Sequence, residues 1–186
     1  MVVTGSLSSP QTLDGVLWFL RQVWPFLRRR VPELDLRIAG QSPSPGLAAR
    51  CRQSEVELVA DPEDMDRVVS GAAIYLCPVR LGSGIKLRVM DGLRHGALVV
   101  THEVSARGYR EFLDRPWLST YTGAEECVDV LTRVCKEGPF DGAAQVQQTY
   151  RENFTFDAGV RRIGQTLRAH LDRDLWSASF LGNENG

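Results

Sequence analysis

Short apolar runs alternate with amphipathic stretches along most of the sequence, and this alternation limits the fold more than any other feature. Apolar runs of about four to six residues suit buried strands, whereas apolar residues three and four apart suit one face of a helix. Strands and helices that alternate predict a parallel sheet covered by helices on both sides. We expect a single doubly wound, Rossmann-like α/β domain of about six strands, at residues 2–5, 34–40, 56–59, 74–78, 97–101 and 118–121.

Several short patterns predict where the helices between these strands begin or break. Pro25 predicts a break in an amphipathic stretch that starts near Pro10. Asp61-Pro62-Glu63-Asp64 predicts a helix start with Asp61 as the capping residue. Thr122-Gly-Ala-Glu125 fits a capping box at the start of another helix.

The composition disfavours several functional classes. The formal net charge is −1, whereas binding to nucleic acid of any sequence needs a strong basic excess. No apolar run approaches the roughly 20 residues that cross a bilayer, and the first residues lack the basic and apolar regions of a signal peptide. We therefore expect a cytoplasmic protein with no membrane span and no nucleic-acid partner.

Metal ligands and cofactor motifs are also missing from the sequence patterns. The four cysteines form no C-x-x-C pair, and the three histidines are scattered. Asp64-Met-Asp66 has the spacing of a pair that holds a divalent ion, but it falls in a predicted helix, where we expect a solvated first turn. We expect no metal and no cofactor.

The segment Pro78–Asp91 (PVRLGSGIKLRVMD) joins the end of a central predicted strand to a predicted helix. Ligands of open α/β sheets bind beside the carboxyl ends of the strands. Gly82 and Gly84 permit positive φ and a close approach of the backbone. A helix start also supplies free amides and a partial positive charge, which together favour an anion.

Three cations surround this helix start, where Asp and Glu are the usual residues. Arg80, Lys86 and Arg88 would repel the helix dipole unless an anion lies among them. A diphosphate would fit, with Lys86 at a phosphate and the amides of Ser83 to Ile85 beneath it. The alternative is an ordinary turn, with these cations in water and Arg88 forming an exposed pair with Asp91.

Three segments of the sequence are similar to one known family. They are Thr4–Leu7 with Trp24-Pro25 downstream, Asp61–Asp64, and Pro78–Gly96 followed by ALVVT and SARG. Together they resemble the C-terminal domain of GT-B glycosyltransferases of the family 4 type, also called glycosyl transferases group 1. The resemblance covers roughly residues 2–108, with weaker similarity from Thr155 into the final helix.

The resemblance implies roles for individual residues. Lys86 would contact the phosphates of the donor, and Asp91 would accept hydrogen bonds from ribose hydroxyls. Ser83 to Ile85 would lie under the diphosphate and the sugar, and Asp61 would lie near the base. The full set of nucleotide-sugar-binding residues that we predict is Gly5, Asp61, Arg80, Gly82, Ser83, Gly84, Ile85, Lys86 and Asp91.

The resemblance also implies an activity and a missing partner. The family transfers a sugar from a nucleoside diphosphate such as UDP or GDP to an acceptor, usually with retention, and a separate N-terminal domain holds the acceptor. Val2 directly begins a predicted strand, so we expect a domain taken from a larger protein; a short natural chain is the alternative. Residues 1–155 would bind the nucleotide sugar, and residues 156–186 would form a helix and tail against the missing N-terminal domain. Without that domain we expect little or no activity, and self-association through the exposed face.

Two departures from the family pattern leave a second hypothesis open. Many members carry glutamates at the positions of Ser83 and Asp91, and a cation after the first strand, where this chain has SLSSPQ. Lys86 could supply that charge, but the chain could instead be a non-catalytic nucleotide-binding or scaffold domain. A dehydrogenase is a poor third reading, because G-x-G-x-x-G does not follow the first strand.

Overall fold

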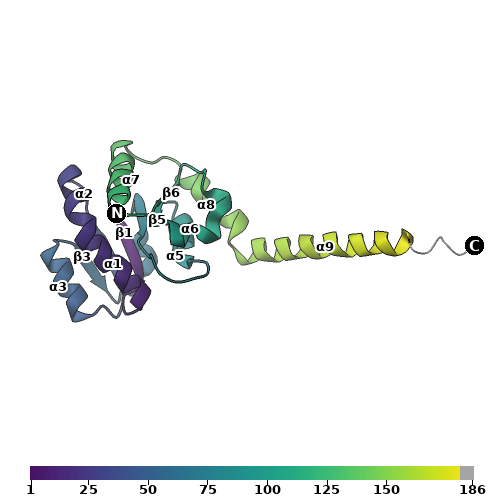
Figure 1. The fold of residues 1–186 in the computed structure, drawn as a ribbon, viewed down its shortest axis with the longest axis horizontal. Helices are drawn as coiled ribbons and strands as arrows, with labels where there is room; N and C mark the ends of the chain where they lie inside the picture. The colour runs from purple at the N-terminus through teal and green to yellow at the C-terminus, as the bar shows by residue number, and fades with distance from the viewer. Residues whose placement is uncertain (181–186) are drawn as a thin grey trace, which may run out of the picture. The chain divides into compact units, whose positions relative to one another are not determined.

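The computed structural model describes the backbone of residues 1–180 and the side chains of residues 1–171. The chain divides into two compact units, residues 1–147 and residues 148–186. The first unit contains a six-stranded sheet in the order β3-β2-β1-β4-β5-β6 (Figure 1). All neighbouring strands are parallel; they are β1 (Val2–Ser6), β2 (Arg37–Gln41), β3 (Glu57–Ala60), β4 (Ile74–Cys77), β5 (Leu98–His102) and β6 (Leu118–Tyr121). The expected Rossmann-like fold is confirmed.

The strands of the sheet pair least extensively at its centre, between β1 and β4. Strands β1 and β2 pair over five residues, and β4 and β5 pair over four. Strands β1 and β4, in contrast, are joined at one position, Val2 to Tyr75. The sheet therefore consists of two three-stranded halves that diverge toward their carboxyl ends. The strand order reverses at this joint, and in open α/β folds such a switch point is where ligands bind.

Helices cover both faces of the sheet, because the strands are apolar on both sides. One face packs into a continuous apolar core with α1 (Pro10–Gln22), α2 (Trp24–Arg30), α3 (Pro45–Gln53) and α7 (Ala124–Lys136). On the other face α5 (Leu87–Arg94) lies close to the sheet, and a Cβ atom on Gly92 would come within 2.7 Å of Val99 and 3.0 Å of Tyr75. The remaining short helices are α4 (Met65–Val69), α6 (Glu103–Ala106) and the 3-10 helix Arg107–Phe112.

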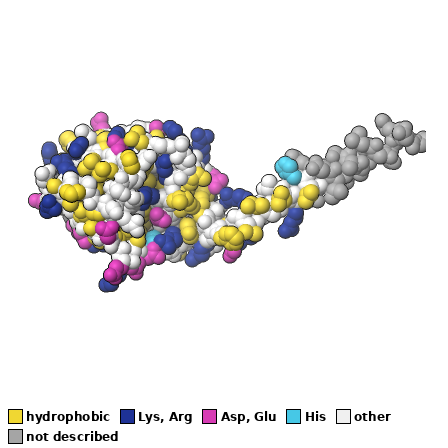
Figure 2. Space-filling view, turned by 90° about the horizontal axis from the view of Figure 1, so that it is seen from below, with side chains coloured by type: hydrophobic (Ala, Val, Ile, Leu, Met, Phe, Trp, Pro, Cys, Tyr) yellow, Lys and Arg dark blue, Asp and Glu magenta, His cyan; other side chains and the backbone are white. Residues whose placement is uncertain are grey.

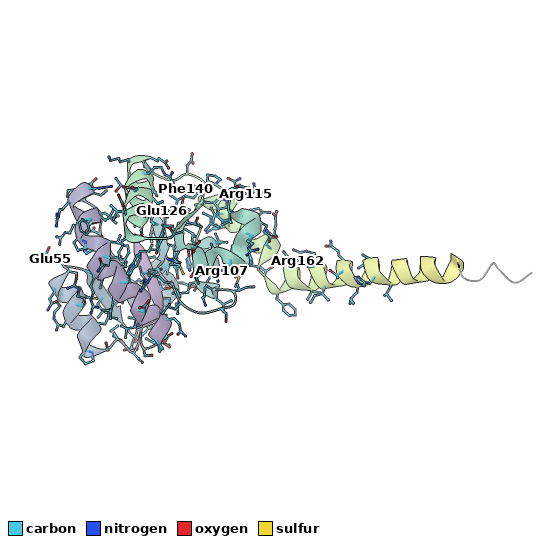
Figure 3. The ribbon with its side chains drawn as sticks, in the orientation of Figure 1. Glu55, Arg107, Arg115, Glu126, Phe140 and Arg162 are labelled. Atoms are coloured by element: carbon cyan, nitrogen blue, oxygen red, sulfur yellow. The ribbon has the colours of Figure 1, made fainter. Side chains whose placement is uncertain are left out.

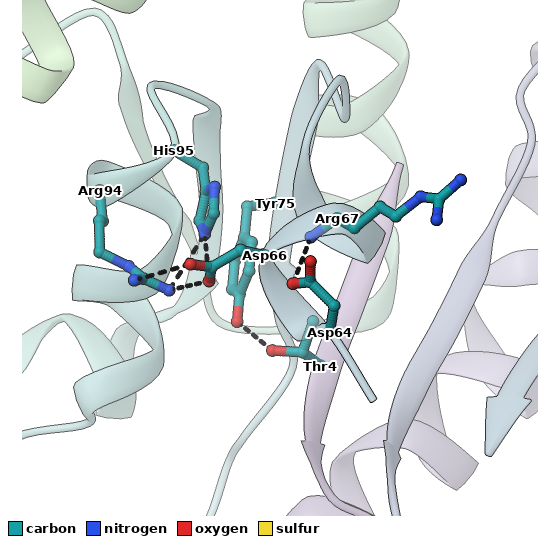
Figure 4. Close-up of polar contacts among 7 residues, drawn as sticks. All are labelled: Thr4, Asp64, Asp66, Arg67, Tyr75, Arg94 and His95. Carbon is teal, nitrogen blue, oxygen red and sulfur yellow. Dashed lines mark hydrogen bonds and ion pairs between the residues drawn. The ribbon is translucent and has the colours of Figure 1, made fainter. Parts of the chain in front are cut away.

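Two predicted helix starts are shifted in the structure. Asp64, rather than Asp61, caps α4 by accepting the Arg67 backbone N–H at 3.0 Å (Figure 4). At the start of α7, the Thr122 backbone N–H donates to Glu126 at 2.8 Å, so Glu126 takes the part predicted for Glu125 (Figure 3). The predicted break at Pro25 is confirmed, because α1 ends at Gln22 and α2 begins at Trp24.

The acidic pair at positions 64 and 66 lies exposed at the start of α4, as the sequence predicts, and Asp66 also contacts α5. Asp66 forms an ion pair with Arg94 of α5, and His95 Nε2 lies 3.4 Å from the same carboxylate (Figure 4). These contacts link α4 to the end of α5. Among the described residues no group of three or more Asp, Glu, His or Cys side chains could hold a metal ion.

The second unit is dominated by α9 (Phe156–Phe180), which follows α8 (Ala143–Asn153). Its described side chains include one exposed apolar row (Figure 2), formed by Phe156, Val160, Ile163, Leu167 and Leu171. Residues 181–186, the end of the predicted tail, lie outside the described residues. No described helix is both long and apolar enough to cross a membrane.

Candidate functional site

A pocket of about 490 Å³ opens where the two halves of the sheet diverge. We call it the carboxyl-edge pocket, because every segment that lines it follows the carboxyl end of β1 or β4. One wall comes from Ser9, Gln11 and Thr12 at the start of α1. Val79, residues 85–88 and Asp91 form the other, on the way from β4 into α5.

Two helix starts meet at this pocket. Helix α1 begins after Ser9, and α5 begins after Lys86. Neither of these two caps donates or accepts a side-chain capping hydrogen bond within the described chain. First-turn amides without a cap carry partial positive charge and seek an acceptor. The pocket thus presents two sets of backbone donors to whatever fills it.

Lys86 is the last residue of the glycine-rich turn, residues 80–86, and its side chain folds back onto that turn. Its Nζ donates to the Ser83 carbonyl at 2.9 Å, and it lies 3.0 Å from where a Cβ atom on Gly82 would stand. Gly82 and Gly84 have φ of 94° and 77°, so the positive φ expected at both positions is confirmed. The turn keeps the Lys86 ammonium beside the pocket on a backbone that only glycine adopts without strain.

The segment that follows β5 also holds the start of α5 in place. The Tyr109 hydroxyl donates to the Lys86 carbonyl at 2.9 Å. Ile85 packs so closely on Gly108 that a Cβ atom there would come within 2.8 Å of it. Ser105 donates to the Val79 carbonyl at 2.7 Å from a buried position. The segment after β5 therefore holds both ends of the loop that lines the pocket.

Arg80 has a different environment from the one expected. Its Nη2 donates to both carboxylate oxygens of Asp14, at 2.9 and 3.1 Å. Its guanidinium lies over the ring of Trp18, 4.9 Å from the centroid. Both partners belong to α1, so Arg80 ties that helix to the loop after β4. Its charge is already balanced by a carboxylate.

The Arg88 side chain reaches from α5 to β1. Its Nη1 donates to the Thr4 carbonyl at 2.9 Å, and a Cβ atom on Gly5 would be 2.5 Å from the guanidinium carbon. Gly5 therefore gives room to a side chain of α5. The sequence analysis predicted Gly5 as a binding residue, but nothing in the sequence showed that Arg88 fills the space beside it.

Asp91 faces the same pocket one turn further along α5. Desolvation by burial raises the pKa of its carboxyl group, and the nearby Arg88 guanidinium opposes that rise. Asp91 forms no ion pair within the described part of the chain. A half-buried carboxylate without a cation partner is suited to accepting hydrogen bonds from hydroxyl groups of a ligand.

The structure brings together some of the predicted site residues but not all. Ile85, Lys86 and Asp91 line the carboxyl-edge pocket. Asp61 lies outside it, after β3, and accepts the Ser42 backbone N–H at 2.8 Å. Sequence reasoning missed three residues of the pocket at the start of α1, namely Ser9, Gln11 and Thr12.

A second pocket, of about 350 Å³, lies at the opposite edge of the sheet. Its two arginines are paired, Arg28 with Glu55 (labelled in Figure 3) and Arg37 with Glu57 at 2.7 Å. Anions gain little from cations that carboxylates already neutralise. The balance of charge therefore favours the carboxyl-edge pocket as the anion site.

The chain is similar to known proteins in sequence and in fold. A sequence model of the family described as glycosyl transferases group 1 matches residues 1–136. A Klebsiella pneumoniae protein described as an uncharacterized 44.6 kDa protein in the cps region is 26% identical over 117 residues, which cover 58% of this chain and 30% of that protein. The structure described as OtsA apo structure matches with a TM-score of 0.55 and 10% identity, over 82% of this chain and 40% of that one. The chain thus spans less than half the length of either protein.

Proposed function

We propose, from the premise that this chain belongs to the glycosyl transferases group 1 family, that it binds the donor of a glycosyl transfer, a nucleoside-diphosphate sugar. The Rossmann-like fold is that of a GT-B glycosyltransferase domain. One observation carries the proposal: two helix starts and the side chains of Lys86, Arg88 and Asp91 meet at one pocket. A separate domain of the parent protein would hold the acceptor.

The residues of the pocket suit the parts of such a donor. The amides at the starts of α1 and α5, together with Lys86, would bind the diphosphate. Asp91 would accept hydrogen bonds from the ribose hydroxyls. During transfer the nucleoside diphosphate leaves with growing negative charge, and donors fixed before the reaction stabilise that charge most effectively. Transfer would proceed with retention at the anomeric carbon.

Titration calorimetry with UDP, GDP and ADP tests the donor site directly. We expect at least one of them to bind the isolated chain, and Lys86→Ala to weaken that binding about tenfold or more, because a hydrogen bond to a charged group is lost. Lys136→Ala is the matched control, since Lys136 is the other lysine of the sequence and lies at the far end of α7. The isolated chain should transfer little or no sugar.

If none of the nucleoside diphosphates binds the unmodified chain, the donor site proposed here is wrong. Equal weakening by Lys86→Ala and Lys136→Ala would assign the binding to general charge rather than to the carboxyl-edge pocket. The position of Asp61 can be tested in the same titrations, because Asp61→Asn should alter the preference among bases if the base lies near β3.

A second candidate function has one observation in its favour. The turn from Arg80 to Lys86 carries no carboxylate, and Ser83 is exposed where many family members carry a glutamate. A non-catalytic nucleotide-binding or scaffold domain would bind the same ligand without transferring the sugar. Assays of the full-length parent protein with a panel of sugar donors separate the two functions, since only a transferase releases free nucleoside diphosphate in the presence of acceptor.

A further inference from the structure

We infer that Arg88 is a diphosphate-binding residue of the carboxyl-edge pocket, whereas Arg80, the other arginine beside the glycine-rich turn, is a structural link. This inference rests on the proposed function. It assigns the second cation of the site to α5, two residues after Lys86, and it explains why position 5 carries glycine.

The argument begins with the joint between β1 and β4. These strands pair only at Val2 and Tyr75, so their ladder does not extend to Thr4. Arg88 satisfies the Thr4 carbonyl with Nη1 at 2.9 Å. A guanidinium has five N–H donors in a rigid, planar fork. One hydrogen bond holds the side chain in place and leaves further donors on a group that lines the pocket.

Arg88 forms no ion pair among the described residues. No carboxylate lies within ion-pair distance of it among the described residues, and Asp91, on the same face of α5, keeps a raised pKa because desolvation by burial outweighs the nearby cation. A partly buried guanidinium without a carboxylate favours a ligand that brings negative charge and paired oxygen acceptors. A diphosphate has both.

Arg80 provides the contrast. Asp14 occupies its Nη2 with two hydrogen bonds, and Trp18 covers one face of its guanidinium. A phosphate at Arg80 would have to displace a carboxylate that already fits. The two arginines differ in partners, although both lie close to the same glycine-rich turn in the sequence.

The Arg88 guanidinium occupies space that is free only because residue 5 is glycine. Any side chain at position 5 would meet the guanidinium carbon at 2.5 Å and both Nη atoms at 2.7 Å. The obstacle is the far end of a flexible side chain, so a methyl group would displace the guanidinium from its seat. Gly5→Ala and Arg88→Ala should therefore impair the same contact, and their effects on binding should not add.

The test compares nucleoside diphosphate with the matching nucleoside, using the base that the unmodified chain prefers. We expect Arg88→Lys, which keeps the charge and one donor to Thr4, to weaken diphosphate binding about tenfold, and Arg88→Ala to weaken it further. Binding of the nucleoside should be unchanged. Arg94→Ala is the matched control, because Arg94 lies on the same helix and pairs with Asp66 away from the pocket. Thermal unfolding of each variant identifies any that fails to fold.

Each outcome separates the inference from the function on which it rests. If the unmodified chain binds no nucleoside diphosphate, the proposed function fails and this inference with it. If the chain binds but folded Arg88→Lys binds equally well, or if diphosphate and nucleoside weaken together, Arg88 has only a structural role. A larger loss for Arg80→Lys than for Arg88→Lys would reverse the assignment of the two arginines.

Discussion

If the proposed function is right, Asp91 favours a ligand at the expense of stability. Its pKa is raised in the folded chain from an ordinary value of 3.8, mainly by desolvation. The folded state therefore binds more protons than the unfolded state between these two pKa values, and stability falls as the pH rises through that interval. Ionisation of this carboxyl group therefore lowers the free energy of unfolding.

Replacing this carboxylate should raise stability. We expect Asp91→Asn to unfold at higher denaturant concentration than the unmodified chain at pH 7, and the difference to vanish as the pH falls below about 4, where unfolded Asp is protonated. The same change should weaken nucleotide binding if the proposed function is right. Asp114→Asn, at an exposed position, serves as the control and should change stability by less than about 0.5 kcal/mol. A destabilised Asp91→Asn would mean that the carboxylate has a favourable partner in the fold.

At the scale of elements, the approach of α1 to the loop after β4 builds one wall of the site. A Cβ atom on Gly15 would lie 2.3 Å from the Pro78 carbonyl oxygen, and neither backbone can yield easily. We expect Gly15→Ala to lower the free energy of unfolding by about 2 kcal/mol, within the range of overpacked cores, although alanine is the better helix former. Denaturant unfolding measures the change.

A matched glycine shows whether this effect comes from packing. Gly46, in the first turn of α3, has its nearest neighbour, Ser44 Oγ, at 3.9 Å. Gly46→Ala should be neutral or slightly stabilising, because the added methyl group meets open space. If the two substitutions changed stability alike, the close contact at Gly15 would not be what limits α1.

Local patterns in the sequence were sufficient to predict the elements but not all of their connections. Apolar runs and helical spacing placed all six strands within a few residues of their bounds, since both signals depend on near neighbours in the chain. The prediction that Asp61 caps α4 was wrong. Asp64 is the cap, and Asp61 instead accepts a hydrogen bond from the Ser42 backbone in another loop. Such contacts between distant segments leave no periodic signal.

The candidate site likewise combines features that the sequence predicts with contacts that it does not. The glycine-rich turn and Lys86 stand out in the sequence, because cations at a helix start are unusual. The different partners of Arg80 and Arg88 do not, since Asp14 is 66 residues from Arg80 and Thr4 is 84 residues from Arg88. Which cation stays available to a ligand depends on how β1 and α1 lie beside the loop after β4.

For the whole molecule, the apolar row on α9 predicts how the chain behaves at high concentration. Leu167 and Leu171 are 57% and 61% exposed, and apolar side chains in such a row favour association. We expect the chain to form oligomers in sedimentation experiments and Leu167→Glu to reduce them. Gln165→Glu, which adds the same charge beside the row, should leave the distribution unchanged. A monomer at all concentrations would show that the row does not drive self-association.

Because β1 and β4 pair at one position only, the sheet is weakest at its centre. Each half has ladders of four or five residues, so partial opening should cost least free energy along the joint. A nucleotide that contacts α1 on one side and α5 on the other would stabilise the closed sheet against that opening. Backbone amides beside the joint would then exchange with deuterated solvent more slowly when the site is filled, while those at the outer edges of the sheet would change little.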